Sequence, residues 1–128
     1  MGMLGGVLNG AASADVEAMF AAGDLRPPEH AAAHYPIPKW ADGVEVHGIV
    51  VLRGGDGDLF VEQDDDNPDA FSVYFHVNPD SDHAKHEGGG VEAVADFRTA
   101  KLANAFARGL VTRMKARGQL KHPAVYAF

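Results

Sequence analysis

The sequence contains no cysteine. Disulfide bonds, thiolate nucleophiles and zinc sites built on cysteine pairs are therefore excluded. The chain also lacks an apolar run of the length that a membrane-spanning helix needs. Its N-terminal segment MGMLGGVLNGAASA has no basic residue and is interrupted by glycines, which makes it a poor signal peptide. We therefore expect a cytoplasmic protein that makes no contact with a membrane.

Acidic residues are missing from the last quarter of the chain. All 18 of them precede Phe97, accompanied there by only four basic residues, so this part carries a formal charge of −14. The remainder holds seven basic residues and carries +7. Such asymmetry indicates a charged partner, pairing of opposite patches between copies of the chain, or a basic helix lying on its own acidic body.

A chain of 128 residues, 46% hydrophobic and 23% charged, is typical of one globular domain. We expect a flexible N-terminus over residues 1–12 and then a short helix from Ser13 to Gly23. Four prolines predict an extended strap over 24–42, which Tyr35 and Trp40 hold to the core. The tail, residues 119–128, is expected to dock on a neighbouring copy or to fold back along its own sheet.

Alternating apolar residues predict four strands, over 44–53, 59–63, 71–77 and 91–97. A long helix with Asp96 or Thr99 as its N-cap follows, and Gly118 ends it. The expected fold is an α+β two-layer sandwich, with an antiparallel sheet of about four strands and the long C-terminal helix packed on one face. The residues expected on the inner side of the sheet or on the buried side of the helix are Val44, Val46, Val50, Leu52, Phe71, Val73, Phe75, Val77, Val91, Ala93, Ala95, Phe97, Leu102, Phe106, Leu110 and Met114.

Residues 88–110, GGGVEAVADFRTAKLANAFARGL, combine a strand with a DF-x-T entry into an alanine-rich helix. The segment resembles the ending of small uncharacterised proteins carried on proteobacterial plasmids and phages. This resemblance implies a mobile-element accessory protein and assigns no catalytic residue. The matching residues are Asp96, Phe97, Thr99, Ala103, Phe106, Ala107 and Leu110.

The segment NPDSDHAKHEGGG, residues 78–90, raises the question of a metal site. Asp80, Asp82, His83 and His86 offer ligands that suit zinc, nickel or copper. A glycine-ended stretch of this length is also typical of a solvated loop between strands. Because no known ligand spacing is present, we expect a mobile loop and no bound metal or cofactor.

Three other motifs do not meet the requirements of the chemistry that they suggest. Ser81, Asp82 and His83 are adjacent, whereas a catalytic triad is assembled in space. The stretch GGDGD, residues 54–58, lacks the lysine and hydroxyl residue of a phosphate-binding loop. The stretch DDDNPD, residues 64–69, lacks the glycine and distal glutamate of a calcium-binding EF-hand. We expect both stretches to be hairpin turns.

Polar residues of the predicted strands gather on the face away from the long helix. Histidines and carboxylates there would suit general acid–base catalysis if the strands are neighbours, which makes a small enzyme one alternative. The other interpretation is the solvated face of a half-buried sheet. The residues expected on this face are Glu45, His47, Tyr74, His76, Glu92 and Asp96.

Two charged surfaces are candidates for partner binding. One is a basic stripe on the long helix, formed by Lys101, Arg108 and Lys115 and flanked by Arg98. The other is the acidic turn that contains Asp64, Asp65, Asp66 and Asp69. We favour a non-catalytic protein-binding accessory factor, an acidic inhibitor of a host nucleic-acid-handling system, with a homo-oligomer as a further expectation.

Nucleic-acid binding through the basic helix is the remaining alternative. The order of strands and helix resembles that of the double-stranded RNA-binding domain, whose last helix begins with lysines. The additional strand over 91–97 departs from that order, and the −14 body would repel phosphates. We therefore expect a protein partner rather than nucleic acid.

Overall fold

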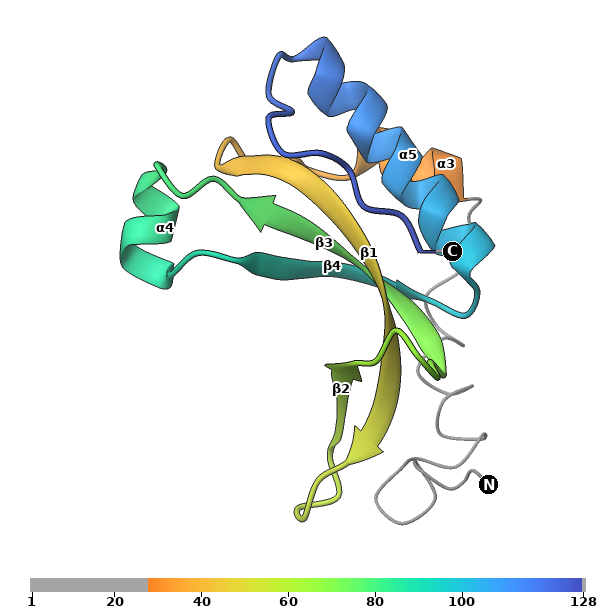
Figure 1. The fold of residues 1–128 in the computed structure, drawn as a ribbon. Coiled ribbons are helices and arrows are strands. Elements are labelled where there is room, and N and C mark those ends of the chain that lie inside the picture. The colour runs from red at the N-terminus through yellow and green to blue at the C-terminus, as the bar shows by residue number, and fades with distance from the viewer. Residues whose placement is uncertain (1–27, 128) are drawn as a thin grey trace.

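The computed structural model of the chain describes residues 28–127. The four strands form one antiparallel sheet in the order β2-β1-β3-β4. Helix α5 packs on one face of this sheet with α3 beside it (Figure 1), so the predicted α+β two-layer sandwich is confirmed. The predictions of a flexible N-terminus and of a helix from Ser13 concern residues outside the described range. The elements are α3 (Pro28–His34), β1 (Ala41–Arg53), β2 (Leu59–Gln63), β3 (Ala70–Val77), α4 (Asp82–Glu87), β4 (Val91–Phe97) and α5 (Ala100–Ala116).

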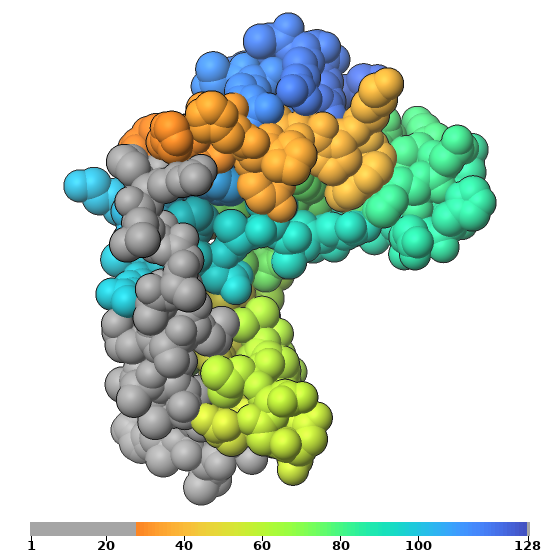
Figure 2. All heavy atoms as spheres, turned by 180° about the vertical axis from the view of Figure 1, so that it is seen from behind, coloured from red at the N-terminus to blue at the C-terminus, as the bar shows by residue number. Residues whose placement is uncertain are grey.

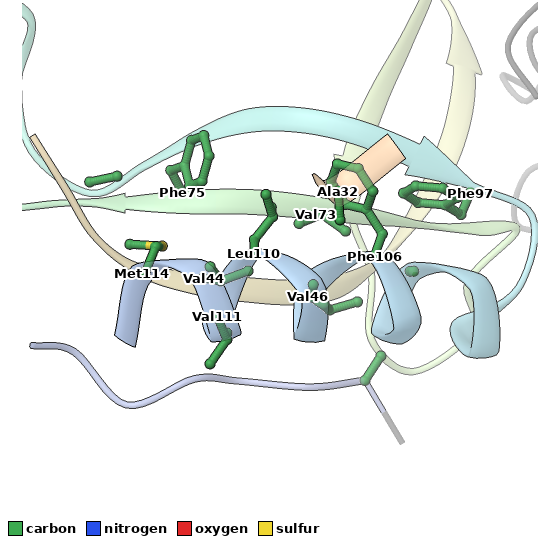
Figure 3. Close-up of a cluster of buried hydrophobic side chains, with 14 residues drawn as sticks. Ala32, Val44, Val46, Val73, Phe75, Phe97, Phe106, Leu110, Val111 and Met114 are labelled. Atoms are coloured by element: carbon green, nitrogen blue, oxygen red, sulfur yellow. The ribbon is translucent and has the colours of Figure 1, made fainter. Parts of the chain in front are cut away.

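The core lies between the sheet and α5, where side chains from both layers interdigitate (Figure 3). Phe75, Phe106 and Leu110, predicted to be central, are 3%, 2% and 0% exposed. Thr99 caps the start of α5 by accepting a hydrogen bond from the backbone N–H of Leu102. None of the helices within residues 28–127 is long and apolar enough to cross a membrane.

The proline-rich strap was predicted to be extended, which is wrong for its first part, because α3 forms there. Pro28 occupies the first helical position, where its missing N–H costs nothing, and alanines follow. The guanidinium of Arg113 donates to the carbonyls of Ala32 (2.5 Å) and Tyr35 (2.7 Å) at the end of α3. Gly109 lets the helices approach, since a Cβ there would lie 2.6 Å from that of Ala32.

The segment 78–90 was predicted to be a loop, but it contains helix α4. Ser81 provides the N-cap, and its hydroxyl accepts from the N–H of Ala84. The helix ends at Gly88, whose φ of 93° suits a residue without a side chain. Its six residues were too few for a helical periodicity to be recognised in the sequence.

A bulge in β4 changes which residues face the core. Val73 pairs with Ala95, but the next residue of β3, Tyr74, pairs with Ala93, which leaves Val94 as an extra residue. One inserted residue exchanges the two faces of a strand beyond it. The predicted inner face of Val91, Ala93, Ala95 and Phe97 therefore holds only at its C-terminal end, and Val91 is 41% exposed.

Strand β1 also changes its buried face, close to Gly48. Before this point Val44 and Val46 pack under α5, as predicted. After it, Ile49 and Val51 are fully buried, whereas Val50 and Leu52, the predicted inner residues, are partly exposed. The C-terminal half of β1 bends away from the helix layer and pairs with β2 (Figure 1). In Figure 2 the hairpin of β2 and the C-terminal half of β1 projects from the rest of the molecule, and a hollow lies between this hairpin and α4.

The C-terminal tail folds back along its own sheet. It runs parallel to the N-terminal half of β1, on the edge that β2 does not reach (Figure 1). The N–H of Val46 donates to the carbonyl of Val125 (2.8 Å), and the N–H of Val125 donates to the carbonyl of Val44 (3.1 Å). The side chain of Asn104 on α5 binds both backbone groups of Ala127. The tail thus pairs with the free edge of β1 through an isolated parallel bridge between Glu45 and Val125.

Candidate functional site

The sheet face away from α5 carries a cluster of histidines and carboxylates. Cross-strand pairing places Glu45 opposite Tyr74, and His47 opposite Ser72. Their neighbours Val44, Val46, Val73 and Phe75 lie in the core, so these polar side chains project from the other face. The structure therefore brings together five of the six residues expected there: Glu45, His47, Tyr74, His76 and, beside Ser72, Asp96.

Glu92 is the exception, and its predicted position is wrong. Because of the bulge at Val94 it pairs with Phe75 and lies on the helix side of the sheet. There its carboxylate contacts Nε2 of His83. The ring of His83 stacks on Trp40, with centroids 4.1 Å apart and planes inclined by 6°. Trp40 thus holds α4 to the sheet, and Glu92 and His83 belong to this contact.

His122 joins the cluster from the tail, and the sequence analysis missed it. Its ring stacks on that of His76, with centroids 3.7 Å apart and planes inclined by 3°. Gly43, opposite His76 in the sheet, makes room, since a Cβ there would lie 2.8 Å from the Cβ of His122. The backbone N–H of His122 donates to the carbonyl of Asp42 (2.8 Å). Only a tail folded along β1 brings His122 here.

Asp42 orients His76. The register of β1 against β3 shifts between Ala41 and Gly43, and such bulges redirect side chains. Nδ1 of His76 donates to the carboxylate of Asp42 at 2.6 Å, and the Asp42 side chain is only 10% exposed. With its proton on Nδ1, the imidazole of His76 keeps Nε2 available to accept a hydrogen bond or to bind a cation.

Glu45 is held in a similar way by His47. Nε2 of His47 lies 2.8 Å from Oε1 of Glu45, and Nδ1 lies 3.2 Å from the carboxylate of Asp65. Partial desolvation would raise the pKa of the Asp65 carboxyl, but hydrogen bonds from Gly48 N–H, Gln63 and His47 lower it below its ordinary value. The β2–β3 turn, through Asp65, therefore supports the cluster.

Tyr74 and Asp96 lie at the other end of the cluster. The hydroxyl of Ser72 donates to the carboxylate of Asp96. Burial raises the pKa of the Tyr74 phenol, and the negative charges of Asp96 and Asp65 raise it further, against a hydrogen bond with Ser72. Tyr74 is therefore a neutral hydrogen-bonding group rather than a base near neutral pH.

Three residues of the cluster have the geometry of a potential ligand set for a metal ion. Glu45, His76 and His122 each offer one ligand atom, and these atoms lie within 4.8 Å of one another. Nε2 of His122 is 3.5 Å from Oε2 of Glu45. No other group of three such residues is found within residues 28–127. Asp80, Asp82, His83 and His86, the ligands considered in the sequence, do not converge.

The acidic turn is stiffened by its own carboxylates. Asp64 accepts hydrogen bonds from the N–H groups of Asp66 and Asn67, both at 3.1 Å. Asp65 accepts from Gly48 N–H at 2.7 Å, and Asp69 accepts from Val51 N–H at 3.1 Å. Asp65, Asp66 and Asp69 remain exposed. The turn thus presents negative charge from a fixed backbone.

The basic stripe lies on the exposed side of α5, and Arg98, Lys101, Arg108 and Lys115 are all exposed. The guanidinium of Arg108 also lies over the ring of Tyr126, 5.1 Å from its centroid, and so helps to hold the tail. Arg113, by contrast, points to α3. Met114, in the last turn of α5, is 0% exposed, so the end of the helix remains packed on the core.

Two clefts open near the cluster without enclosing it. One, of about 490 Å³, lies beside Asp42 and is lined by three cations, Lys39, Arg117 and Lys121. The other, of about 460 Å³, lies between the strap and β4, at Trp40 and Glu92. Neither of these two clefts is lined by His47 or His76, whose side chains are 17% and 21% exposed.

The fold and these sites define a small α+β sandwich protein with two charged surfaces and a histidine–carboxylate cluster. Comparison of the chain with protein-family models, with curated proteins and with solved structures finds no match.

Proposed function

We propose that this protein is a non-catalytic protein-binding factor and that it binds its partner through the projecting hairpin. This acidic hairpin, residues 53–69, carries seven carboxylates and one basic residue, Arg53. The observation that carries the proposal is the position of Phe60, which is 45% exposed on β2 in the middle of this acidic segment.

The surroundings of Phe60 suit a protein interface. Leu52 pairs with Phe60, and Val50, on the same face, is partly exposed as well, which forms an apolar strip. An aromatic side chain within a charged rim is typical of the centre of a binding surface. Strand β2 also lies at an edge of the sheet and pairs with no strand but β1 within residues 28–127.

The charge of the hairpin selects the kind of partner. Seven carboxylates attract a basic protein surface and repel phosphates, so the partner is a protein, of the kind that itself holds nucleic acid. The function that follows is inhibition of a host nucleic-acid-handling system by a plasmid or phage protein in the cytoplasm.

Site-specific cross-linking in the native host tests the proposal. A photoreactive phenylalanine at position 60 should capture one protein, whereas the same group at the exposed Ala116 on α5 should not. Heparin should compete with capture. The variant Asp56→Asn/Asp58→Asn/Asp66→Asn should weaken binding of the identified partner by at least about tenfold, since each charge pair contributes to affinity.

The substitution keeps oxygens that can accept the backbone hydrogen bond from Asp58 N–H, so folding should be preserved. Two results would contradict binding through the acidic hairpin. One is equal capture of the partner from positions 60 and 116, and the other is undiminished capture by the variant in which the three aspartates are replaced with asparagine.

A further inference from the structure

We propose that Glu45, His76 and His122 bind one divalent transition-metal ion of the zinc, cobalt or nickel class, and that this ion clamps the C-terminal tail to the sheet. The site is independent of the acidic hairpin proposed above as the partner-binding surface. It joins three segments that are distant in sequence: β1, β3 and the tail.

The donor set determines the class of ion. Two imidazoles and one carboxylate suit zinc and its neighbours in the first transition series, whereas magnesium and calcium prefer oxygen ligands alone. Three protein ligands leave a fourth position for water, and solvent reaches the site, since the side chains of His76 and His122 are 21% and 36% exposed.

The surrounding residues already orient two of the three ligands. Asp42 accepts the Nδ1–H of His76, which leaves Nε2 for the ion. His47 holds one oxygen of Glu45, while the other, Oε2, faces His122. Carboxylates and histidines that fix ligands in this way are typical of protein metal sites. A merely solvated sheet face would not need a carboxylate as buried as Asp42, at 7% exposure.

The site must close slightly to take an ion. With bonds of about 2.0–2.1 Å, two ligand atoms of a tetrahedral zinc site lie roughly 3.3 Å apart. Here the ligand atoms lie within 4.8 Å of one another, and the rings of His76 and His122 are stacked with their planes inclined by 3°. A turn of the more exposed His122 ring out of the stack would aim both imidazoles at one point. The backbone of the tail, fixed to β1, can remain in place.

The ion would strengthen the attachment of the tail. His122 follows Lys121, and the N–H groups of both donate to the carbonyl of Asp42. A bond from the ion to His122 would tie this point to two strands of the sheet at once. Metal binding should therefore slow the opening of residues 121–127, and this effect separates a built site from a loosely held ion.

Titration of the chelator-washed full chain, with any affinity tag removed, tests the proposal. Zinc should bind one-to-one with a dissociation constant of about 1 μM or below in calorimetry. Cobalt should give a visible spectrum of tetrahedral type. Hydrogen exchange of residues 121–127 should slow when zinc is added. The variant Asp42→Asn should weaken zinc binding by about 10–100-fold, and His122→Ala or Glu45→Gln by more.

The double variant His83→Ala/His86→Ala is the control and should bind zinc as the unmodified chain does. Circular dichroism establishes that each variant is folded, and Glu45→Gln keeps the size of the side chain in case His122→Ala loosens the tail. No saturable binding below about 1 mM would overturn the proposal. Binding that survives His122→Ala, or that the control variant loses, would also overturn it, as would zinc binding without any change in tail exchange.

Discussion

Phe106 lies at the centre of the core, where its ring contacts Phe97 and Tyr35 at centroid distances of 5.2 and 5.8 Å. We expect Phe106→Ala to lower the free energy of unfolding by about 3–5 kcal/mol, because the cavity between α5 and the sheet cannot collapse fully. Urea denaturation measures this. A loss below about 1 kcal/mol would show that α5 is held to the sheet by other contacts.

Asp65 should make stability depend on pH. The pKa of its carboxyl is lower in the folded chain than the ordinary value of 3.8, so its contribution is present above 3.8 and is lost as the pH falls through the folded value. Asp65→Asn should therefore reduce stability at pH near 7, and the difference from the unmodified chain should shrink below 3.8. The effect is small because the Asp65 side chain is 48% exposed.

Denaturation of both proteins across this pH range provides the measurement. Asp66→Asn is the matched control, since Asp66 is an exposed neighbour whose carboxylate lies outside the cluster. A difference for Asp65→Asn that stays constant with pH would contradict the role of its hydrogen bonds.

The contact between helices α3 and α5 depends on Gly109. In an exposed helix, replacing glycine with alanine stabilises by about 1 kcal/mol. Here the new Cβ would lie 2.6 Å from the Cβ of Ala32, so α3 must move. We expect Gly109→Ala to destabilise the fold, as measured by thermal melting. In a Gly109→Ala/Ala32→Gly double variant, part of the loss should be recovered. Additive effects would show that the two helices are not in close contact.

The tail depends on Asn104, which binds the N–H and the carbonyl of Ala127 at 3.1 and 2.6 Å. We expect Asn104→Ala to cost about 1–3 kcal/mol at most, because the freed backbone groups can turn to water when the tail opens. Hydrogen exchange of residues 121–127 should become faster, while the strands stay protected. Unchanged exchange in the tail would show that its pairing with β1 suffices alone.

The whole molecule is an electrostatic dipole, with the acidic hairpin at one end of the sheet and the exposed stripe Lys101, Arg108 and Lys115 on α5. We expect copies to associate through opposite patches at low salt, and to separate by about 0.5 M salt, since exposed charges are screened over about 8–10 Å near physiological ionic strength. Sedimentation velocity tests this.

The variant Lys101→Glu/Arg108→Glu/Lys115→Glu reverses the charge of the stripe and should abolish the association. Lys85→Glu on α4 serves as the control, because Lys85 is exposed outside the stripe. A monomer at every salt concentration would reject self-association and leave the stripe to a foreign partner or to solvent.

The pattern of apolar residues was sufficient to predict the two-layer fold. Leu102, Phe106, Leu110 and Met114 recur at helical spacing, and Phe71 to Val77 alternate, so the buried sides of α5 and β3 could be predicted without knowledge of their neighbours. The sequence also limited the N-cap of α5 to Asp96 or Thr99. These features depend on residues close in sequence, and the sequence alone therefore determined them.

The histidine–carboxylate cluster was only partly predictable. Alternation along β1 and β3 placed Glu45, His47, Tyr74 and His76 on one face, because the period of an unbroken strand is fixed. Glu92 was misplaced, because nothing in VEAVADF marks the bulge at Val94, which arises from its pairing with β3. His122 was missed because it reaches the cluster only when Gly43 leaves space and Asn104 holds the tail.

Contacts between residues distant in the sequence determined those features of the fold that the local pattern of residues could not predict. The bend of β1 at Gly48 follows from its pairing with β3 on one side and with β2 further along, which buries Ile49 and Val51 on the opposite face. Helix α3 persists in a proline-rich segment because Arg113 satisfies its last carbonyls. The sequence by itself determined the two layers and the charge dipole. The layers follow from the apolar periodicity within each element, and the dipole follows from the order of the charged residues along the chain. The bulge, the docking of the tail on β1 and the ligand set depend on partners far away in the chain, and only tertiary packing brings these together.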